Sequence, residues 1–193
     1  MYKTYKYLMS KPLVVKNKND NANIEYYITD FEKENRIYLD RISQINENAF
    51  FNAKIKDSVE VFMNENLCIS THAFENSSFC DFICVNGQER FSENNKENYS
   101  HEKIEVQYEA FKNCENLCSA VFPSAKNISI EKEAFRNCPN LRTVVLLCEN
   151  ENSVYIAPDA FDENEKLTFV CIKGSDIERY AREHNFRIVS INE

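Results

Sequence analysis

Two consecutive stretches of the chain follow the same pattern. "EAFKNCENLCSAVFPSAKNISIEK" occupies residues 109–132, and "EAFRNCPNLRTVVLL" follows it at residues 133–147. The dipeptide Ala-Phe recurs at intervals of 24, 37, 24 and 26 residues, at 49–50, 73–74, 110–111, 134–135 and 160–161. A period in this range is typical of a solenoid, in which each repeat forms one coil and the coils stack. The interval of 37 equals one period plus an insertion of 13 residues.

The residues after each Ala-Phe support this interpretation. A small residue lies three places after each of the first four phenylalanines, at Ala53, Ser77, Cys114 and Cys138. Strand-like runs such as "SAVF" and "TVVLL" follow, and a second short apolar alternation closes each unit. We therefore expect two short strands and two corners per coil, with equivalent strands about 4.8 Å apart. The five phenylalanines are expected to form one buried column of ring contacts.

The pattern "AFxNCxxLxxVxxP", with "IxIxxEAF" before it, resembles that of the BspA-type leucine-rich repeat family. The resemblance covers residues 44–173 and is strong at residues 109–123 and 133–147. It implies a mostly β, leucine-rich-repeat solenoid of about five 24-residue coils. Similar proteins include surface adhesins that bind host or matrix proteins, so the resemblance also implies a binding role.

The two ends of the chain lack the repeat and are expected to be caps. Residues 1–43 predict a β-rich N-terminal cap, with "PLVV" (12–15) and "IEYYITDF" (24–31) as strands around a polar turn. Residues 174–193 predict a helix-strand cap, because Ser175 and Glu178 form a capping-box pattern and Asn185 suits a left-handed stop. The repeats then occupy residues 44–173, with the insertion at 86–103.

The composition argues against several classes of protein. The chain has 193 residues and a formal net charge of −8, so a nucleic-acid backbone is not an expected partner. It has no run of 18 apolar residues, so no membrane span is expected. Gly87 and Gly174 are the two glycines, too few for a phosphate-binding loop. The first residues show no secretory signal, which favours a cytoplasmic location, with the cell surface as the alternative.

The eight cysteines do not form a metal-ligand pattern. No Cys-x-x-Cys pair occurs, and the pairs four residues apart would lie about 13 Å apart on a strand, too far to bind one ion. Cys114 and Cys138 occupy equivalent positions, within disulfide range, but alanine and serine serve there in other units, so buried reduced thiols are expected. None of His72, His101 and His184 stands in a catalytic frame. We expect no enzyme activity, metal or cofactor; the alternative is an active site in the N-terminal cap and insertion.

The predicted outward side of the main strands is the candidate surface for a protein partner. Alignment of the repeats places there Phe82, Cys84, Ser119, Val121, Thr143, Val145, Phe169 and Cys171. Four of them are large and apolar, which is typical of an interaction site. Phe91 and Tyr99 of the insertion are a second candidate contact, with a solvated loop as the alternative. The sequence thus predicts a non-catalytic, adhesin-like interaction module; the alternative is an intracellular scaffold or regulatory subunit that self-associates.

Overall fold

The computed structural model describes residues 15–18, 21–24, 36–86, 101–122, 124–148 and 153–192. These residues form twelve strands and one helix, which confirms the mostly β expectation. The elements are β1 (Val15–Lys18), β2 (Asn21–Ile24), β3 (Arg36–Ile45), β4 (Ser58–Ile69), β5 (Asp81–Asn86), β6 (His101–Val106), β7 (Ser119–Val121), β8 (Ala125–Ile130), β9 (Thr143–Val145), β10 (Val154–Ile156), β11 (Thr168–Ile172), α2 (Asp176–Glu183) and β12 (Arg187–Ile191).

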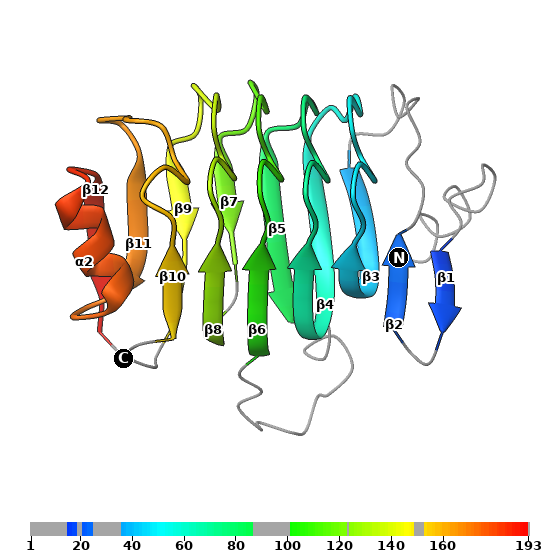
Figure 1. Ribbon diagram of the computed structural model, residues 1–193, viewed down its shortest axis with the longest axis horizontal. Coiled ribbons are helices and arrows are strands. Elements are labelled where there is room, and N and C mark those ends of the chain that lie inside the picture. Colours follow the sequence, from blue (N-terminus) through cyan, green and yellow to red (C-terminus); the bar gives the residue numbers. More distant parts are fainter. Residues whose placement is uncertain are drawn as a thin grey trace.

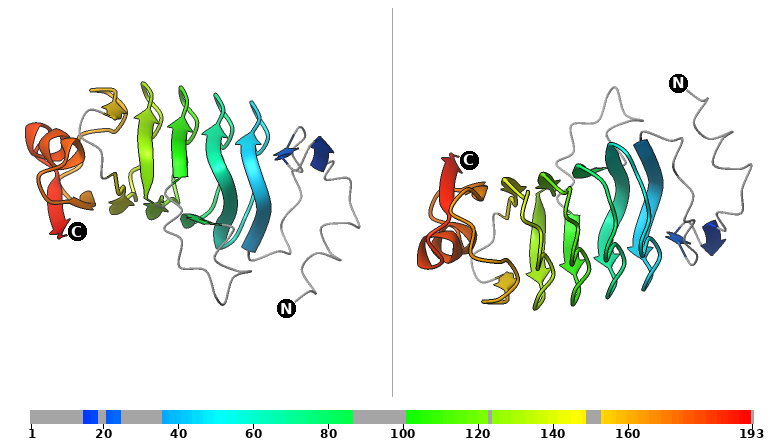
Figure 2. Two further views of the ribbon diagram at one scale, coloured as in Figure 1. Left: turned by 90° about the horizontal axis from the view of Figure 1, so that it is seen from below. Right: turned by 90° about the horizontal axis from the view of Figure 1, so that it is seen from above.

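The strands form the two walls of a stack of coils (Figure 1). One path of paired strands runs β1-β2-β3-β4-β5-β7-β9-β11-β12, and we call its part from β3 onward the main wall. The side wall consists of the second half of β4 with β6, β8 and β10. Every pair is parallel except β1 with β2. Figure 2 shows the strands side by side along the long axis, with α2 at the C-terminal end. This architecture is the predicted solenoid.

β3 and β4 each run through both walls, whereas the following coils contribute a separate strand to each wall. β5 pairs with β4 and β7 in the main wall, whereas β6 pairs with β4 and β8 in the side wall. β5 and β6, although consecutive in sequence, therefore pair with strands of neighbouring coils and not with each other. The corners that follow the side-wall strands lie along the upper edge in Figure 1, and they hold the Ala-Phe dipeptides.

The phenylalanines of these dipeptides form the column that the repeat predicts. Four successive ring pairs stack with centroid distances of 4.8–5.1 Å and interplanar angles of 4–6°. The rings belong to Phe50, Phe74, Phe111, Phe135 and Phe161, all of them buried. Such contacts contribute about 0.5–1.5 kcal/mol per pair beyond the burial of area. The column therefore runs through the whole stack and links every coil to the next.

Four of the five corners turn through two residues with left-handed backbone. The first set, directly before Ala-Phe, has φ of 54–57° and comprises Asn48, His72, Glu109 and Glu133. The second set has φ of 56–59° and comprises Asn52, Asn76, Asn113 and Asn137. Asparagine tolerates this conformation better than most residues. The Asn137 amide donates to Oδ1 of Asn113 at 2.8 Å, and the Asn113 amide donates to Oδ1 of Asn76 at 2.9 Å. We call these three residues the asparagine ladder.

In three corners the small residue donates a hydrogen bond to a backbone carbonyl group in the preceding coil. The thiols of Cys114 and Cys138 each donate to the carbonyl oxygen of the column phenylalanine one coil before, at 3.1 Å. The hydroxyl of Ser77 makes the equivalent hydrogen bond. All eight cysteines are free thiols, so Cys114 and Cys138 are packed as small donors and do not form a disulfide.

The C-terminal helix forms where the capping pattern predicts it. The side chain of Ser175 accepts a hydrogen bond from the backbone N–H of Glu178 at 3.3 Å, and Ile177 and Ala181 are buried against the last coil. Asn185 ends the segment with a φ of 58°, and β12 then pairs in parallel with β11.

The N-terminal strands differ from the expectation. β1 and β2 fall within residues 15–24, where a polar turn was expected between two apolar strands. The polar residues of β1 and β2 have a low strand propensity, so the sequence did not predict strands there. β2 nevertheless pairs with β3, and backbone pairing in a sheet outweighs residue propensity. Residues 12–14 and 25–31 of the two expected strands lie outside the described residues. β3 is already parallel to β4 from Arg36 onward, so coil stacking begins there.

Candidate functional site

The parallel register of the main wall aligns equivalent outward side chains from five strands. Direct pairing connects each member to the next. The members are Ile83, Val121, Val145, Val170 and Val189, and we call them the apolar row. The first four are partly exposed, and Val189 is 51% exposed. The main wall thus presents a continuous line of apolar side chains to solvent.

The alternation along each strand explains this orientation. β7 and β9 each have one buried residue between two partly exposed ones, and β11 continues the same alternation over five residues. Successive side chains of a strand point to opposite faces. The buried members face the phenylalanine column, so the partly exposed members point away from it.

Only half of the side chains expected on this surface lie there. Ser119, Val121, Thr143 and Val145 are outward and partly exposed. The outward placement of the other four is wrong, because each is at most 1% exposed and faces the core: Phe82, Cys84, Phe169 and Cys171. The ring of Phe82, for example, packs edge-on against that of Phe111 at 5.0 Å.

A one-residue difference in connection length causes this error. The first inward residue of the main strand lies nine places after the column phenylalanine in most units, as in Phe111 to Ala120. The distance is eight places from Phe74 to Phe82 and from Phe161 to Phe169. A shift of one residue moves every side chain of a strand to the opposite face. The outward residues of β5 and β11 therefore include the aliphatic residues Ile83 and Val170, which the alignment of the repeats did not place on this surface.

Polar residues border the apolar row on one side. The adjacent outward row is paired in the same register and comprises Asp81, Ser119, Thr143, Thr168 and Arg187. Within it, the hydroxyl of Ser119 donates to Oδ1 of Asp81 at 2.5 Å. On the opposite side the surface continues with apolar residues, since Ile172 pairs with Ile191, which is 39% exposed.

The row also becomes polar toward the N-terminal end. Ile83 pairs with Glu60, which pairs with Tyr38. Arg36 contacts Asp57 at 3.0 Å and Glu60 at 3.7 Å beside them. The apolar surface therefore begins at β5 and extends to β12. Phe91 and Tyr99, the other predicted contact residues, lie outside the described residues.

The sequence matches the description "BspA type Leucine rich repeat region", in six copies over residues 86–192, which is more than half of the chain. The chain belongs to the BspA-type leucine-rich repeat family. Comparison with curated proteins and with solved structures gave no significant match. Family membership supports a protein–protein interaction module in general, and such repeats are typically non-catalytic.

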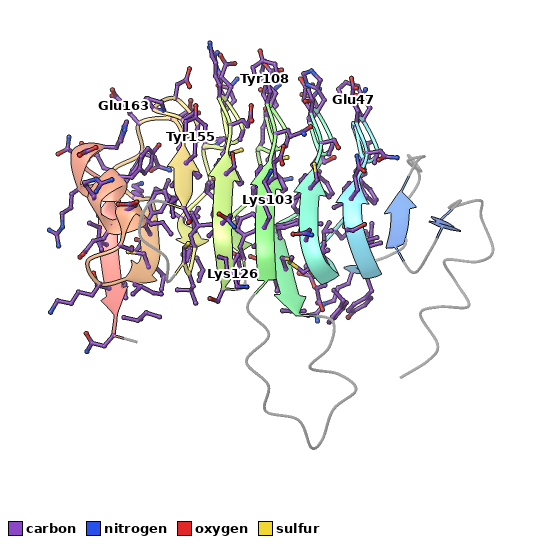
Figure 3. The ribbon with its side chains drawn as sticks, turned by 60° about the horizontal axis from the view of Figure 1, so that its bottom comes forward. Glu47, Lys103, Tyr108, Lys126, Tyr155 and Glu163 are labelled. Carbon is purple, nitrogen blue, oxygen red and sulfur yellow. The ribbon has the colours of Figure 1, made fainter. Side chains whose placement is uncertain are left out.

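The side wall of this BspA-type repeat is polar, in contrast to the main wall. Figure 3 labels Lys103, Lys126 and Tyr155 on it. The Lys103 ammonium contacts Glu105 at 2.6 Å, and Tyr155 is 57% exposed at the rim of an open depression of about 260 Å³. Polar groups such as Asn127 and Ser129 line the depression. The same coils therefore carry an apolar outer surface on one wall only.

The buried thiols of this BspA-type repeat are poor nucleophiles. Burial raises the pKa of Cys84, Cys114 and Cys138, the last to about 12, so these thiols are protonated at neutral pH. A reactive cysteine requires a thiolate, which a dry apolar site disfavours.

Among the described residues, no helix has the length and apolarity that a membrane span requires.

Proposed function

We propose that this chain is a non-catalytic interaction module that binds a protein partner through the apolar row. The observation that carries the proposal is the contrast between the two walls. Both walls are built from the same coils, yet the main wall exposes five aligned aliphatic side chains and the side wall exposes polar ones. Solvation alone favours polar residues on both, and exposed apolar patches mark interaction sites.

The dimensions of the row suit a segment of another protein. Five residues at a strand spacing of about 4.8 Å extend over about 19 Å. That length matches about 13 residues of an amphipathic helix, which rises about 1.5 Å per residue. The hydroxyls of Ser119, Thr143 and Thr168 border the row, so the surface has the apolar centre and polar rim of a protein interface. The adhesins in the family support a partner on a cell or matrix surface.

Self-association is the second candidate, and the end of the main wall favours it. β12 is the last strand of the wall, and within the described residues one of its edges has no strand beside it. Val189 and Ile191 on this strand are among the most exposed apolar residues described. An exposed edge strand with apolar side chains is a template for pairing with another chain.

The test compares two double variants that add the same charge to different walls. Val121→Glu/Val145→Glu places two carboxylates on adjacent strands of the apolar row. Ser129→Glu/Tyr155→Glu places them on adjacent strands of the side wall and is the matched control. Circular dichroism would first establish that both variants retain the β spectrum of the wild type. A photo-crosslinking residue at position 145, or at position 129 as control, then identifies the protein that contacts each wall.

The proposal predicts one crosslinked partner from position 145 and not from 129, with binding lost in the main-wall variant and kept in the side-wall variant. Purified partner then gives the affinity by calorimetry. Equal binding by the two variants would refute the assignment to the apolar row. A crosslink between two copies of this chain, with a dimer mass by light scattering, would replace the protein partner with self-association.

A further inference from the structure

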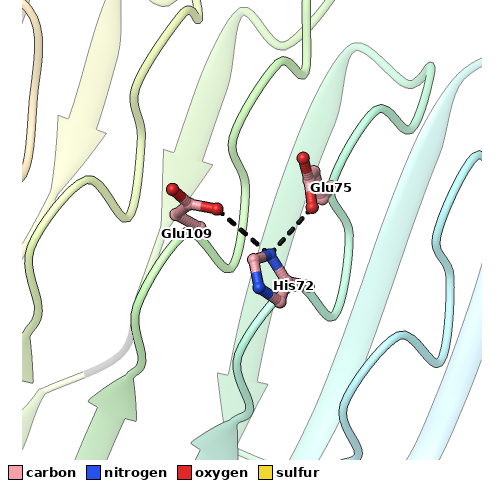
Figure 4. Close-up of side chains that lie close together, drawn as sticks. All are labelled: His72, Glu75 and Glu109. Carbon is pink, nitrogen blue, oxygen red and sulfur yellow. Dashed lines mark ion pairs between the residues drawn. The ribbon is translucent and has the colours of Figure 1, made fainter.

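Three potential metal ligands from two adjacent coils converge at one corner. His72 and Glu109 are equivalent residues, since each directly precedes an Ala-Phe dipeptide and has left-handed φ, 56° and 54°. Glu75 lies three residues after His72, in the same corner. Figure 4 shows both carboxylates directed at the imidazole ring. Stacking of the coils therefore brings together residues that are 37 positions apart in the sequence.

The three ligand atoms are close enough to surround one ion. Nδ1 of His72 lies 2.8 Å from Oε2 of Glu75 and 3.2 Å from Oε2 of Glu109. One ligand atom from each residue lies within 4.8 Å of both others. The exposed fractions of the side chains are 27%, 16% and 7% for His72, Glu75 and Glu109. The cluster is thus sheltered but has access to solvent through the imidazole.

Hydrogen bonding does not account for the arrangement. Nδ1 of His72 is buried, and among the described residues it has no hydrogen-bond partner, although two carboxylate oxygens lie within reach. A buried polar atom without a partner is rare in native proteins and calls for a ligand or an explanation. Here the unpartnered nitrogen faces the same small volume as two acidic oxygens.

The donor set is one that transition metals use. Zn²⁺ binds imidazole nitrogen and carboxylate oxygen at about 2.0–2.2 Å, so neighbouring ligands of a tetrahedral site lie about 3.4 Å apart. The observed separations of 2.8 and 3.2 Å are about 0.6 and 0.2 Å shorter than this, so small side-chain movements would open the site for an ion. Three protein ligands would leave one position for water.

The surroundings hold one ligand in place. Nζ of Lys112 lies 2.6 Å from Oε1 of Glu109, and the Tyr108 hydroxyl also bonds this carboxylate. The lysine contact is to Oε1, whereas Oε2 is the oxygen that lies 3.2 Å from Nδ1 of His72. Carboxylate ligands of metals are commonly oriented by such hydrogen bonds. The positive charge of Lys112 disfavours the binding of a metal cation nearby, whereas the two carboxylates and the net charge of −8 favour it.

We propose that His72, Glu75 and Glu109 form a binding site for a divalent transition-metal cation such as Zn²⁺. The bound ion links the second coil to the third. The site is separate from the apolar row, because it lies at the corner and not on the main wall. It stabilises the stack in the way that structural metals link distant parts of small proteins.

The test uses the metal alone. Protein is treated with a chelator, dialysed, and titrated with ZnCl₂ in a calorimeter. We expect saturable binding with one ion per chain and a rise in thermal midpoint at saturating zinc. Co²⁺ in place of Zn²⁺ provides a second readout, since its visible absorption reports the type and number of its ligands.

Variants locate the site. His72→Asn removes the nitrogen ligand and is compatible with folding, because Asn48 occupies the equivalent position with a φ of 57°. His72→Asn and Glu75→Gln are each expected to weaken zinc binding at least about tenfold and to change the cobalt spectrum. His184→Gln controls for adventitious binding to histidine, and Cys80→Ser/Cys118→Ser for binding to accessible thiols. Both controls should bind zinc like the wild type.

Two results would overturn the proposal. One is no saturable binding to the wild type at millimolar zinc. The other is undiminished binding by His72→Asn, or binding lost in the cysteine control. Neither result affects the apolar row, whose test involves no metal.

Discussion

Truncation of one ring in the middle of the phenylalanine column should greatly destabilise the whole solenoid. Phe111 is fully buried and stacks on Phe74 at 5.1 Å and on Phe135 at 4.8 Å. It also meets Phe82 and Phe79 edge-on, at 5.0 and 6.4 Å. Phe111→Ala therefore removes contacts with both neighbouring coils at once.

The magnitude follows from two contributions. Loss of the buried phenyl group costs about 2 kcal/mol of transfer free energy. The vacated space, about 100 Å³, adds about 2.4 kcal/mol at about 24 cal/mol per Å³ if the corner does not collapse. The sum is about 4–5 kcal/mol, a large part of the stability of a domain of this size. Collapse is restricted because the backbone N–H of Phe111 is bonded to Ala134 of the next coil at 2.8 Å.

The assay is urea unfolding followed by far-ultraviolet circular dichroism. Phe51→Ala is the matched control. Phe51 follows the column residue Phe50 in the sequence, but its ring is partly exposed and does not belong to the column. It should cost about 1 kcal/mol or less, whereas Phe111→Ala lowers the free energy of unfolding by about 4–5 kcal/mol. Equal losses in the two variants, or a loss below about 2 kcal/mol for Phe111→Ala, would refute a shared column as the main link between coils.

Three further predictions concern thiols and the C-terminal cap. A thiol reagent should modify exposed Cys118 first in the native protein, and Cys118→Ser should abolish the fast phase; its persistence would show that a buried thiol is accessible. Hydrogen bonds from the Ser190 hydroxyl and the backbone N–H of Gly174 lower the pKa of Glu178 to about 2, so its stabilising effect is complete above the usual value of 4.5 and is lost as the pH falls toward 2. Glu178→Gln should therefore flatten the acid limb of a stability–pH curve, and an unchanged limb would contradict this role. Cys114→Ser keeps a donor to the preceding coil and should cost less than about 1.5 kcal/mol in urea unfolding, whereas Cys114→Val removes the donor, overpacks the corner and should cost about 2–3 kcal/mol; the reverse order would count against the hydrogen bond.

The fold could be predicted from the sequence because successive coils repeat the same pattern of residues. Ala-Phe fits only one kind of corner, with a methyl group where space is limited and a ring on the column. An asparagine two places after the phenylalanine suits the left-handed turn in four of the units. The Ala-Phe dipeptide recurs five times, so an error in any one unit has little effect on the predicted architecture.

The candidate site was less accessible because a strand face depends on single-residue register. Counting from the repeat predicts Cys84 and Phe169 outward, whereas the position of the strands within the wall shows that Ile83 and Val170 are outward instead. A stricter test of alternation was available: in both units the apolar run offers two registers, and the one with the larger rings inward buries more area. The spacing of the cysteines likewise gave no indication of the cluster around His72. The sequence feature that indicates it is that His72 occupies the position of an acidic residue, Glu109, in the next unit.

The asparagine ladder has a direction. In both of its hydrogen bonds the amide of the later coil donates and the oxygen of the earlier coil accepts. A coil can therefore be added or duplicated only in the same head-to-tail sense. Two stacks joined head to head through this edge would oppose donor to donor or acceptor to acceptor. The ladder thus fixes the direction of stacking. It is compatible with longer arrays of this corner and incompatible with inverted ones.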